Sequence, residues 1–170
     1  MQQVCGLECA IAESRRKAQE VAYKEQKQRD AKTKDRIKTR SEWIREAQVA
    51  FNRYIRARDH GKGCISSGRL YDSIEFGGKM DAGHYRSRGA AGHLRFNLLN
   101  CWAQSVKDNR NLSGNTVEYR KRLIERIGLE RVERLENDNA PRTFDIEYLR
   151  RLKKLMNKRA RYYEKRRTYD

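Results

Sequence analysis

The sequence predicts a mainly helical α+β protein, in which a small ββα centre lies between long basic helices. Residues 64–115 hold most of the glycines and two of the three histidines, and short extended stretches there alternate with turn residues. The segments on either side are highly charged and carry apolar residues at helical spacing. Only 37% of the 170 residues are hydrophobic and 37% are charged, so we expect a small core.

The charge of the chain predicts a polyanionic partner. There are 40 Lys and Arg residues against 23 Asp and Glu residues, which gives a formal net charge of +17. Such an excess repels itself unless a polyanion is near, so nucleic acid is the expected partner, although ribosomal and membrane-surface proteins are also basic. We see no apolar run long enough to span a membrane and no secretory signal, so we expect no membrane association and a cytoplasmic location.

The N-terminal segment, residues 1–38, is predicted as a basic arm. From about residue 10 onward it has helix propensity but no sustained apolar stripe, which favours either a solvated helix or a disordered segment. Such an arm lies along phosphates or serves as a solvated spacer, and the sequence does not decide between the two.

Two further segments are predicted as helical, residues 39–63 and residues 116–170. The first is an amphipathic packing helix that begins with a capping box at Thr39 and Glu42. Its apolar face carries Trp43, Ala47, Ala50 and Tyr54. The second segment contains two shorter helices separated by Gly128, a break around the only proline, and a long basic final helix. Its basic face is a solvated surface or a path for phosphates.

The centre, residues 64–115, carries the candidate chemistry. The stretch IEFGGKMDAGHYRSRG predicts a β-hairpin that holds His84. A helix that starts near Asn100 would then bring Asn100, Asn109 and His84 towards one spot. A lone histidine is usually structural, but one that follows an aspartate in a glycine turn, within a basic surround, is a candidate for catalysis.

Several motifs resemble the NinG (Rap) family of lambdoid phages, recombination endonucleases that cut branched DNA. The resemblance spans roughly residues 39 to 165 and lies in SEWIREAQVAFNRYIRARD, DAGHYRSRGAA, LRFN, NLSGN and YRKRLIERIGLERVERLEND. The family's central block is similar to the HNH, or ββα-metal, nuclease fold built on a treble clef. The resemblance therefore implies a nuclease that acts on Holliday junctions or D-loops in the host cell cytoplasm.

The resemblance also implies roles for single residues. His84 would be the general base, Asn109 and Asp81 would hold a catalytic Mg²⁺ or Mn²⁺, and Asn100 would orient the loop or the histidine. Phosphate contacts are expected from the basic residues Arg86, Arg88, Arg95, Arg110, Arg150, Lys154 and Lys158. The long helices offer surface for a homodimer, although no heptad seam specifies one.

The zinc site of the clef is expected to be degenerate. Where the family has two cysteine pairs, this chain has Cys64 with Ser67, and Ser105 with Asp108. Serine is a poor zinc ligand, so we do not expect a structural Zn²⁺ there. Cys5 and Cys9 resemble half of a family zinc finger and cannot close a tetrahedral site alone. We hypothesise that apolar packing partly replaces the metal, through Phe96, Leu98, Leu99, Trp102 and Val106.

Two functions stay open after these observations. The first is a metal-dependent endonuclease for branched DNA, with His84 as its base. The second is a catalytically degenerate protein that binds branched DNA without cutting it. An RNA-associated basic protein, unrelated to nucleases, would require the motif match to be chance.

Overall fold

The computed structural model describes residues 6–70 and 80–166, and the chain divides into two compact units, Met1–Thr39 and Arg40–Asp170. The first half of the stretch predicted as a hairpin, and Cys5, lie outside the described residues. Within the described ranges, no helix is long and apolar enough to cross a membrane.

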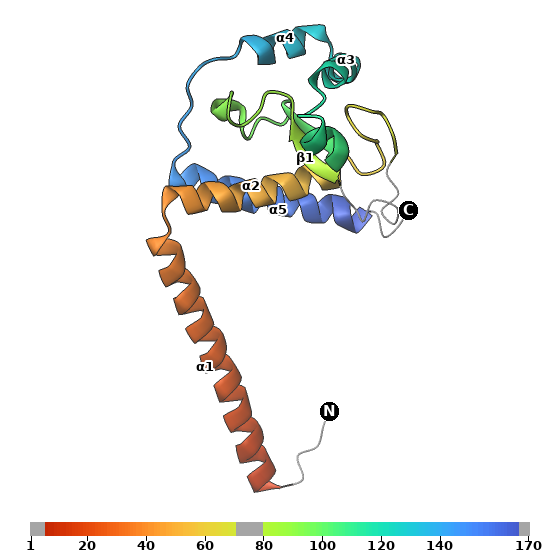
Figure 1. Cartoon of the computed structure of the whole chain (residues 1–170). Coiled ribbons are helices and arrows are strands. Elements are labelled where there is room, and N and C mark those ends of the chain that lie inside the picture. The colour runs from red at the N-terminus through yellow and green to blue at the C-terminus, as the bar shows by residue number, and fades with distance from the viewer. Residues whose placement is uncertain (1–5, 71–79, 167–170) are drawn as a thin grey trace. The chain divides into compact units, whose positions relative to one another are not determined.

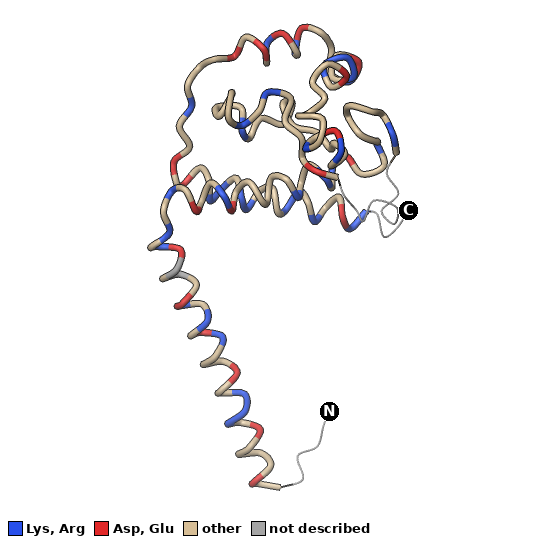
Figure 2. The backbone as a smooth tube through the Cα atoms, viewed as in Figure 1, with Lys and Arg blue, Asp and Glu red and all other residues tan. Residues whose placement is uncertain are grey.

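Helix α1 (Leu7–Ile37) makes up the described part of the first unit (Figure 1). Cations and anions alternate along it (Figure 2) and pair one turn apart, with Arg16 bonded to Glu13 at 2.9 Å and to Glu20 at 3.4 Å. Apolar side chains such as Leu7 and Tyr23 are exposed. The helix is therefore supported by local propensity and by ion pairs along its own surface.

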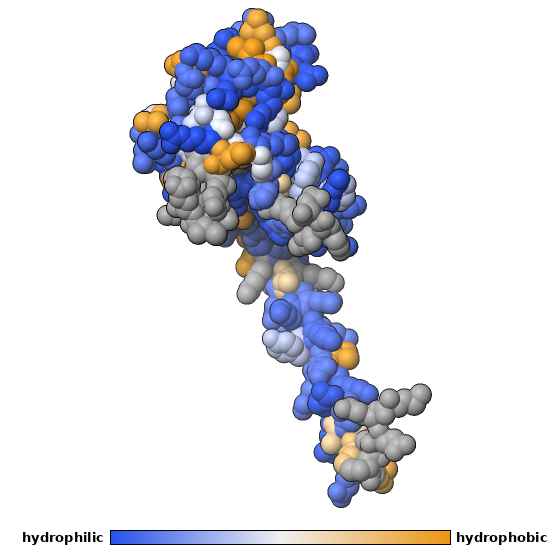
Figure 3. All heavy atoms as spheres, turned by 90° about the vertical axis from the view of Figure 1, so that its right-hand side faces the viewer, coloured by the Kyte–Doolittle hydropathy of each residue, from blue (hydrophilic) through white to orange (hydrophobic). Residues whose placement is uncertain are grey.

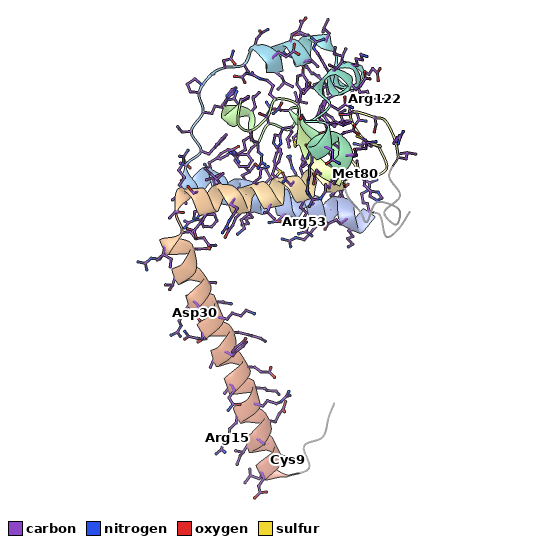
Figure 4. All side chains as sticks on the ribbon, viewed as in Figure 1. Cys9, Arg15, Asp30, Arg53, Met80 and Arg122 are labelled. Atoms are coloured by element: carbon purple, nitrogen blue, oxygen red, sulfur yellow. The ribbon has the colours of Figure 1, made fainter. Side chains whose placement is uncertain are left out.

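The main core lies between helices α2 (Arg40–Arg58) and α5 (Ile146–Arg166), which run side by side (Figure 1). The apolar stripe of α2 predicted from the sequence faces this core. Polar pairs tie the two helices at their edges, since Lys153 bonds Glu46 at 2.7 Å and Arg53, labelled in Figure 4, bonds Glu164 at 2.6 Å. The buried side chains of this main core include Trp43, Phe51, Ile55, Leu149 and Met156.

A second core forms around helices α3 (Thr116–Ile127) and α4 (Leu129–Asn137). Gly128 separates them with a φ of 86°, a conformation that a side chain would oppose. Arg122 of α3, labelled in Figure 4, donates from Nε to the Ser66 carbonyl at 3.1 Å, which ties α3 to the chain before the sheet. The buried side chains of this second core include Ile65, Leu94, Trp102, Tyr119, Leu123, Val132 and Leu135.

The sheet between these cores has two antiparallel strands, β1 (Met80–His84) and β2 (Cys101–Ser105). Asp81 lies opposite Gln104, and His84 lies opposite Cys101. A 3₁₀ turn, η1 (Gly92–Leu94), precedes β2, and a π-helical turn, η2 (Lys107–Asn111), follows it. The predicted mainly helical α+β class with a small sheet is therefore confirmed.

One detail of the predicted centre is wrong. The helix expected near Asn100 is absent, because Cys101–Ser105 forms strand β2 and pairs with β1. All five of its residues are buried between the two cores, so the strand gives no polar alternation that would distinguish it from a buried helical turn.

The surface around these elements is mostly hydrophilic, with apolar side chains in small separate patches (Figure 3).

Candidate functional site

A pocket of about 540 Å³ lies beside β1, whose first residue, Met80, is labelled in Figure 4. Asp81, His84 and Asn109, three of the residues predicted from the sequence as catalytic or metal-binding, all line it. Arg88 and Arg110 line it as well. The fold thus gathers a carboxylate, an imidazole, an amide and two guanidinium groups from two separate stretches of chain.

The His84 imidazole is held in one orientation. Its Nε2 lies 2.9 Å from the carbonyl oxygen of Arg95, and its ring stacks on Phe51 with centroids 6.2 Å apart. A carbonyl only accepts hydrogen bonds, so in the neutral ring the proton sits on Nε2 and the lone pair on Nδ1. Nδ1 lies 3.7 Å from Sγ of Cys101, whose thiol stays protonated because burial raises its pKa.

Burial lowers the pKa of His84 to about 4. The charges of Arg88 and Arg95 lower it further, while the carbonyls of Arg95 and Ala82 oppose the shift. The ring is therefore neutral at pH 7, which is the state that a general base needs before it accepts a proton. Its low pKa also makes it a weaker base than a solvent-exposed histidine.

Asp81 is the carboxylate of the pocket, and both of its oxygens are engaged. Asn109 donates to Oδ2 at 2.9 Å, and Arg110 donates to Oδ2 at 2.8 Å and to Oδ1 at 3.0 Å. Burial opposes ionisation, but the bonds from Arg110 and Asn109 outweigh it and lower the pKa of Asp81. The charges of Arg110 and Arg56 lower it as well, so the carboxylate is charged at neutral pH.

The π-helical turn η2 brings Asn109 and Arg110 to Asp81. It leaves β2 and carries these two consecutive side chains back to a residue 28 and 29 positions earlier in the chain. Short π-helical segments are rare and occur often at functional sites. The turn thus builds the polar side of the pocket.

Gly83 has a steric role between the two candidate residues of β1. A Cβ at this position would lie 2.1 Å from Oε1 and 2.8 Å from Cβ of Gln104. Gln104 itself is fixed, because its Nε2 donates to Ser66 Oγ at 2.7 Å and to the Gly114 carbonyl at 2.6 Å. A side chain directly before His84 would therefore clash with Gln104, and position 83 cannot carry a carboxylate without displacing it.

Asn100 lies outside the pocket and is fully buried. Its Oδ1 accepts from the Arg86 amide at 2.9 Å, and its Nδ2 donates to the Arg86 carbonyl at 3.0 Å. A longer bond of 3.4 Å reaches the Leu94 carbonyl. Of the roles expected for Asn100, the structure shows the loop contact, since it clamps the chain that follows His84.

The predicted phosphate contacts divide into exposed and engaged groups. Arg88 and Arg110 are exposed at the pocket, whereas Arg95 is half-buried near Gln48 and its pKa is lowered by burial and by Arg88. Arg86 donates to the carbonyls of Leu135 and Asp138 at 2.9 and 2.7 Å. These carbonyls end α4 and lack helical partners, so the Arg86 guanidinium supports the fold and is not free for DNA.

The remaining predicted contacts lie on α5. Arg150 stacks over the Trp43 ring with 4.9 Å between its guanidinium carbon and the ring centroid, and its surface is exposed. Lys154 and Lys158 are exposed one turn apart on the same helix. Further exposed Lys and Arg residues lie along α5, so this helix offers basic side chains to solvent.

The four degenerate zinc positions come together as a hydrogen-bonded cluster, which we call the Asp108 cluster: Cys64, Ser67, Ser105, Asp108 and Asn115. Asp108 accepts from Cys64 Sγ at 3.2 Å and Ser105 Oγ at 2.6 Å on one oxygen, and from Asn115 at 2.9 Å on the other. Cys64 Sγ accepts the backbone amides of Ser67 and Ser105 at 3.5 and 3.3 Å. The carboxylate of Asp108, which is itself one of the four positions, is therefore the shared acceptor of this cluster.

The apolar residues named for this replacement lie in different places. Trp102 is buried on β2, the strand that also carries Ser105, and the guanidinium carbons of Arg58 and Arg126 lie 4.1 Å and 5.1 Å from the centroid of its ring. Phe96 belongs to the other core, and Leu99 is 37% exposed. Hydrogen bonds also connect the four positions, and partial replacement of the metal by apolar packing stays a prediction.

The described residues contain no group of three His, Cys, Asp or Glu side chains that could hold a metal ion. A hard cation such as Mg²⁺ needs fewer protein ligands, since it keeps several waters and binds through one or two carboxylates and substrate phosphates. Asn109 Nδ2 donates to Asp81 Oδ2 at 2.9 Å, so the two side chains lie close together at the pocket, and carboxylate and amide oxygens suit such a cation. The fit requires Arg110 to leave Asp81 and the Asn109 amide to turn its oxygen inward.

Sequence reasoning missed two polar groups that support the site. Asp59 is 1% exposed, accepts the Ala103 amide of β2 at 3.0 Å and is paired with Arg58 at 2.7 Å. Tyr85 lines the pocket and bonds Glu136, which Arg120 also holds at 2.7 Å. No local pattern marks the link from Asp59 to Ala103 or the link from Tyr85 to Glu136, because these partners lie 44 and 51 residues apart.

Comparisons with known proteins place the chain in a family. The family model described as Bacteriophage Lambda NinG protein matches residues 1–166. The chain is 42% identical over 132 residues to Protein ninG of Escherichia phage lambda, covering 73% of this chain and 62% of the relative. Protein ninG of Enterobacteria phage H19B is 42% identical over 125 residues, covering 74% and 60% respectively. Protein ninG of Salmonella phage P22 is 41% identical over 132 residues, covering 73% and 63%.

The match leaves part of each relative uncovered, since the chain spans 60 to 63% of the length of these curated relatives. No solved structure matches the chain. The family model and the three relatives agree over most of the sequence. The chain therefore belongs to the NinG family of bacteriophage proteins.

Proposed function

We propose that the chain is a metal-dependent endonuclease that hydrolyses phosphodiester bonds in branched DNA. One observation carries the proposal: His84, Asp81 and Asn109 line a single pocket whose other lining residues include Arg88 and Arg110. This set provides a neutral imidazole, oxygen ligands for a hard cation, and cations for a phosphate. These are the parts that phosphodiester hydrolysis requires.

The residues of the pocket divide the reaction between them. His84 would take a proton from the attacking water on Nδ1, since Nε2–H is bonded to the Arg95 carbonyl, and Nδ1 would have to leave its 3.7 Å contact with the Cys101 thiol to do so. Arg88 binds the phosphate from the exposed side of the pocket. Asp81 and Asn109 would hold Mg²⁺ or Mn²⁺, which supplies positive charge beside the phosphate when it is bound.

The substrate class follows from charge and from the family resemblance. A net charge of +17 and the exposed cations of α5 favour a ligand with dense phosphates. Junctions and D-loops crowd several duplexes at one point, and the resemblance is to nucleases that cut such DNA. We place this activity in the cytoplasm of the phage host, with a homodimer as the form that would make paired cuts.

A second candidate is a protein that binds branched DNA without cutting it. The observation that favours it is the pairing of Asp81, whose two oxygens both accept bonds from Arg110. A carboxylate neutralised in this way holds no cation unless the arginine moves. The depressed pKa of His84, about 4, also weakens it as a base.

Cleavage of an end-labelled four-way junction in Mg²⁺ or Mn²⁺ tests the proposal. We expect cuts that disappear in EDTA and fall about 10² to 10⁴-fold in His84→Ala, the usual loss for a general base. Thermal unfolding of both proteins checks that the variant is folded. Tight binding of the junction without cuts in either metal would support the second candidate and overturn the first.

A further inference from the structure

We propose that Arg110 is a latch on the cation site: its guanidinium occupies Asp81 in the free protein and competes with a divalent cation for that carboxylate. The inference rests on the proposed function, because it takes Asp81 and Asn109 as the cation ligands. It adds a residue that controls when those ligands become available.

The geometry of the pair shows how the site is closed. Nε and Nη2 of Arg110 reach the two oxygens of Asp81 at 2.8 and 3.0 Å, and Asn109 takes a further position on Oδ2 at 2.9 Å. A two-pronged arginine contact of this kind covers the face of a carboxylate on which a metal would sit. The free protein therefore presents Asp81 as a paired group.

The ion pair between Arg110 and Asp81 can break at small cost in free energy. The Arg110 side chain is 65% exposed, and among the described residues its side chain bonds only Asp81. An exposed ion pair contributes little to stability, so its guanidinium swings into solvent at small cost. The Asp81 side chain is 21% exposed and lines the pocket, so it keeps its position when the arginine leaves.

The pocket also offers Arg110 a second partner. It lines the same pocket as Arg88, where a phosphate would bind. A phosphate that draws Arg110 away from Asp81 frees the carboxylate for the cation, so phosphate and cation would favour each other's binding. Since such coupling is reciprocal, removing the arginine should strengthen cation binding in the absence of DNA.

The test is Mn²⁺ binding to the full chain without DNA, followed through the electron paramagnetic resonance signal of free Mn²⁺. We expect Arg110→Gln to lower the Kd for Mn²⁺ about tenfold relative to the unaltered protein. Arg88→Gln is the matched control, because it removes the same charge from the same pocket without touching Asp81. Its Kd should change by less than about threefold.

Asp81→Asn separates this inference from the proposed function. If the unaltered protein binds Mn²⁺, Asp81→Asn loses it and Arg110→Gln binds no more tightly, the latch is wrong and the cation site stands. An equal gain in Arg88→Gln and Arg110→Gln would also overturn the latch, since general charge would then explain both. Failure of all variants to bind Mn²⁺ would overturn the latch and the metal-dependent function together.

Discussion

Two carboxylates are associated with the π-helical turn η2, and they differ in burial and in the charge of their partners. Asp108 is the second residue of the turn and is 5% exposed. It accepts hydrogen bonds from the side chains of Cys64, Ser105 and Asn115. Asp81 meets the next two residues of the turn, lines an open pocket and is balanced by an exposed arginine. The first arrangement is closed and buried, whereas the second is an exposed ion pair, which we propose exchanges its arginine for a ligand.

The contrast shows how one element, η2, takes part in both a buried hydrogen-bonded cluster and an open pocket. The Asp108 cluster fixes η2 to the chain at Cys64, so the same turn presents Asn109 and Arg110 to Asp81. If the cluster is the anchor, damage to it should lower stability, and damage to the Asp81 pair should not.

Asp108→Ala is expected to give the largest loss of stability. The substitution leaves the buried donors of Ser105, Cys64 and Asn115 without an acceptor, so we expect the free energy of unfolding to fall by about 3 kcal/mol. The matched variant Asp81→Ala should cost less than about 1 kcal/mol, because its ion pair is exposed. Urea unfolding of both proteins measures the difference, and equal losses would contradict the comparison.

The depressed pKa of His84 predicts an acid-dependent loss of stability. The folded protein holds this pKa at about 4, whereas 6.5 is its ordinary value, so between these pH values the unfolded chain binds more protons. The free energy of unfolding should therefore fall as pH drops from 6.5 to 4, by on the order of 3 kcal/mol from this residue. Above pH 7 the His84 imidazole is unprotonated in both the folded and the unfolded protein, so it does not make the free energy of unfolding depend on pH there.

His84→Gln isolates that contribution, because a glutamine amide can still donate to the Arg95 carbonyl and does not titrate. Unfolding measured at several pH values should show a flatter decline for the variant. Parallel curves for the two proteins would mean that His84 is not held in its neutral form by the fold.

Gly83→Ala should disturb the spacing of the pocket. Its added Cβ would meet Oε1 of Gln104 at 2.1 Å, so we expect a loss of about 1 to 3 kcal/mol in the free energy of unfolding. Gly89→Ala is the control from the same pocket, since its Cβ would find nothing nearer than Ser87 Oγ at 3.8 Å. That variant should stay within about 0.5 kcal/mol of the unaltered protein.

The basic face of α5 predicts that affinity for DNA depends on salt concentration. If about six phosphates are neutralised, log affinity should fall with log salt at a slope of about −5. Lys154→Gln should reduce the magnitude of that slope by about 1. Arg86→Gln should leave the slope unchanged, because this arginine is bonded to the carbonyls of Leu135 and Asp138. A slope near zero in the unaltered protein would contradict phosphate contacts altogether.

The sequence predicted the features that depend on local spacing. The apolar stripe from Trp43 to Tyr54 became the core face of α2, and Gly128 ended α3 as expected. The spacing predicted that His84, Asn100 and Asn109 lie near one spot; His84 and Asn109 do line one pocket, whereas Asn100 lies outside it, and Asp81, which the family resemblance implied, lines it as well.

The features that were missed depend on contacts distant in the sequence. Strand β2 is recognisable only through its pairing with β1, and its residues are buried without alternation. The link between Arg110 and Asp81 spans 29 residues, and Arg86 meets its carbonyl partners 49 and 52 residues away. No pattern within a single segment carries that information.

The most direct test of the account compares the two carboxylates in the cleavage reaction itself. Single-turnover cutting of a four-way junction in Mn²⁺ would be measured for the unaltered protein, Asp81→Asn and Asp108→Asn, at a temperature where all three are folded. We expect Asp81→Asn to lose cutting at least 100-fold with unchanged stability, and Asp108→Asn to keep cutting within about tenfold despite a lower Tm. Cutting by Asp81→Asn at the unaltered rate would contradict the assignment of the open pocket as the active site.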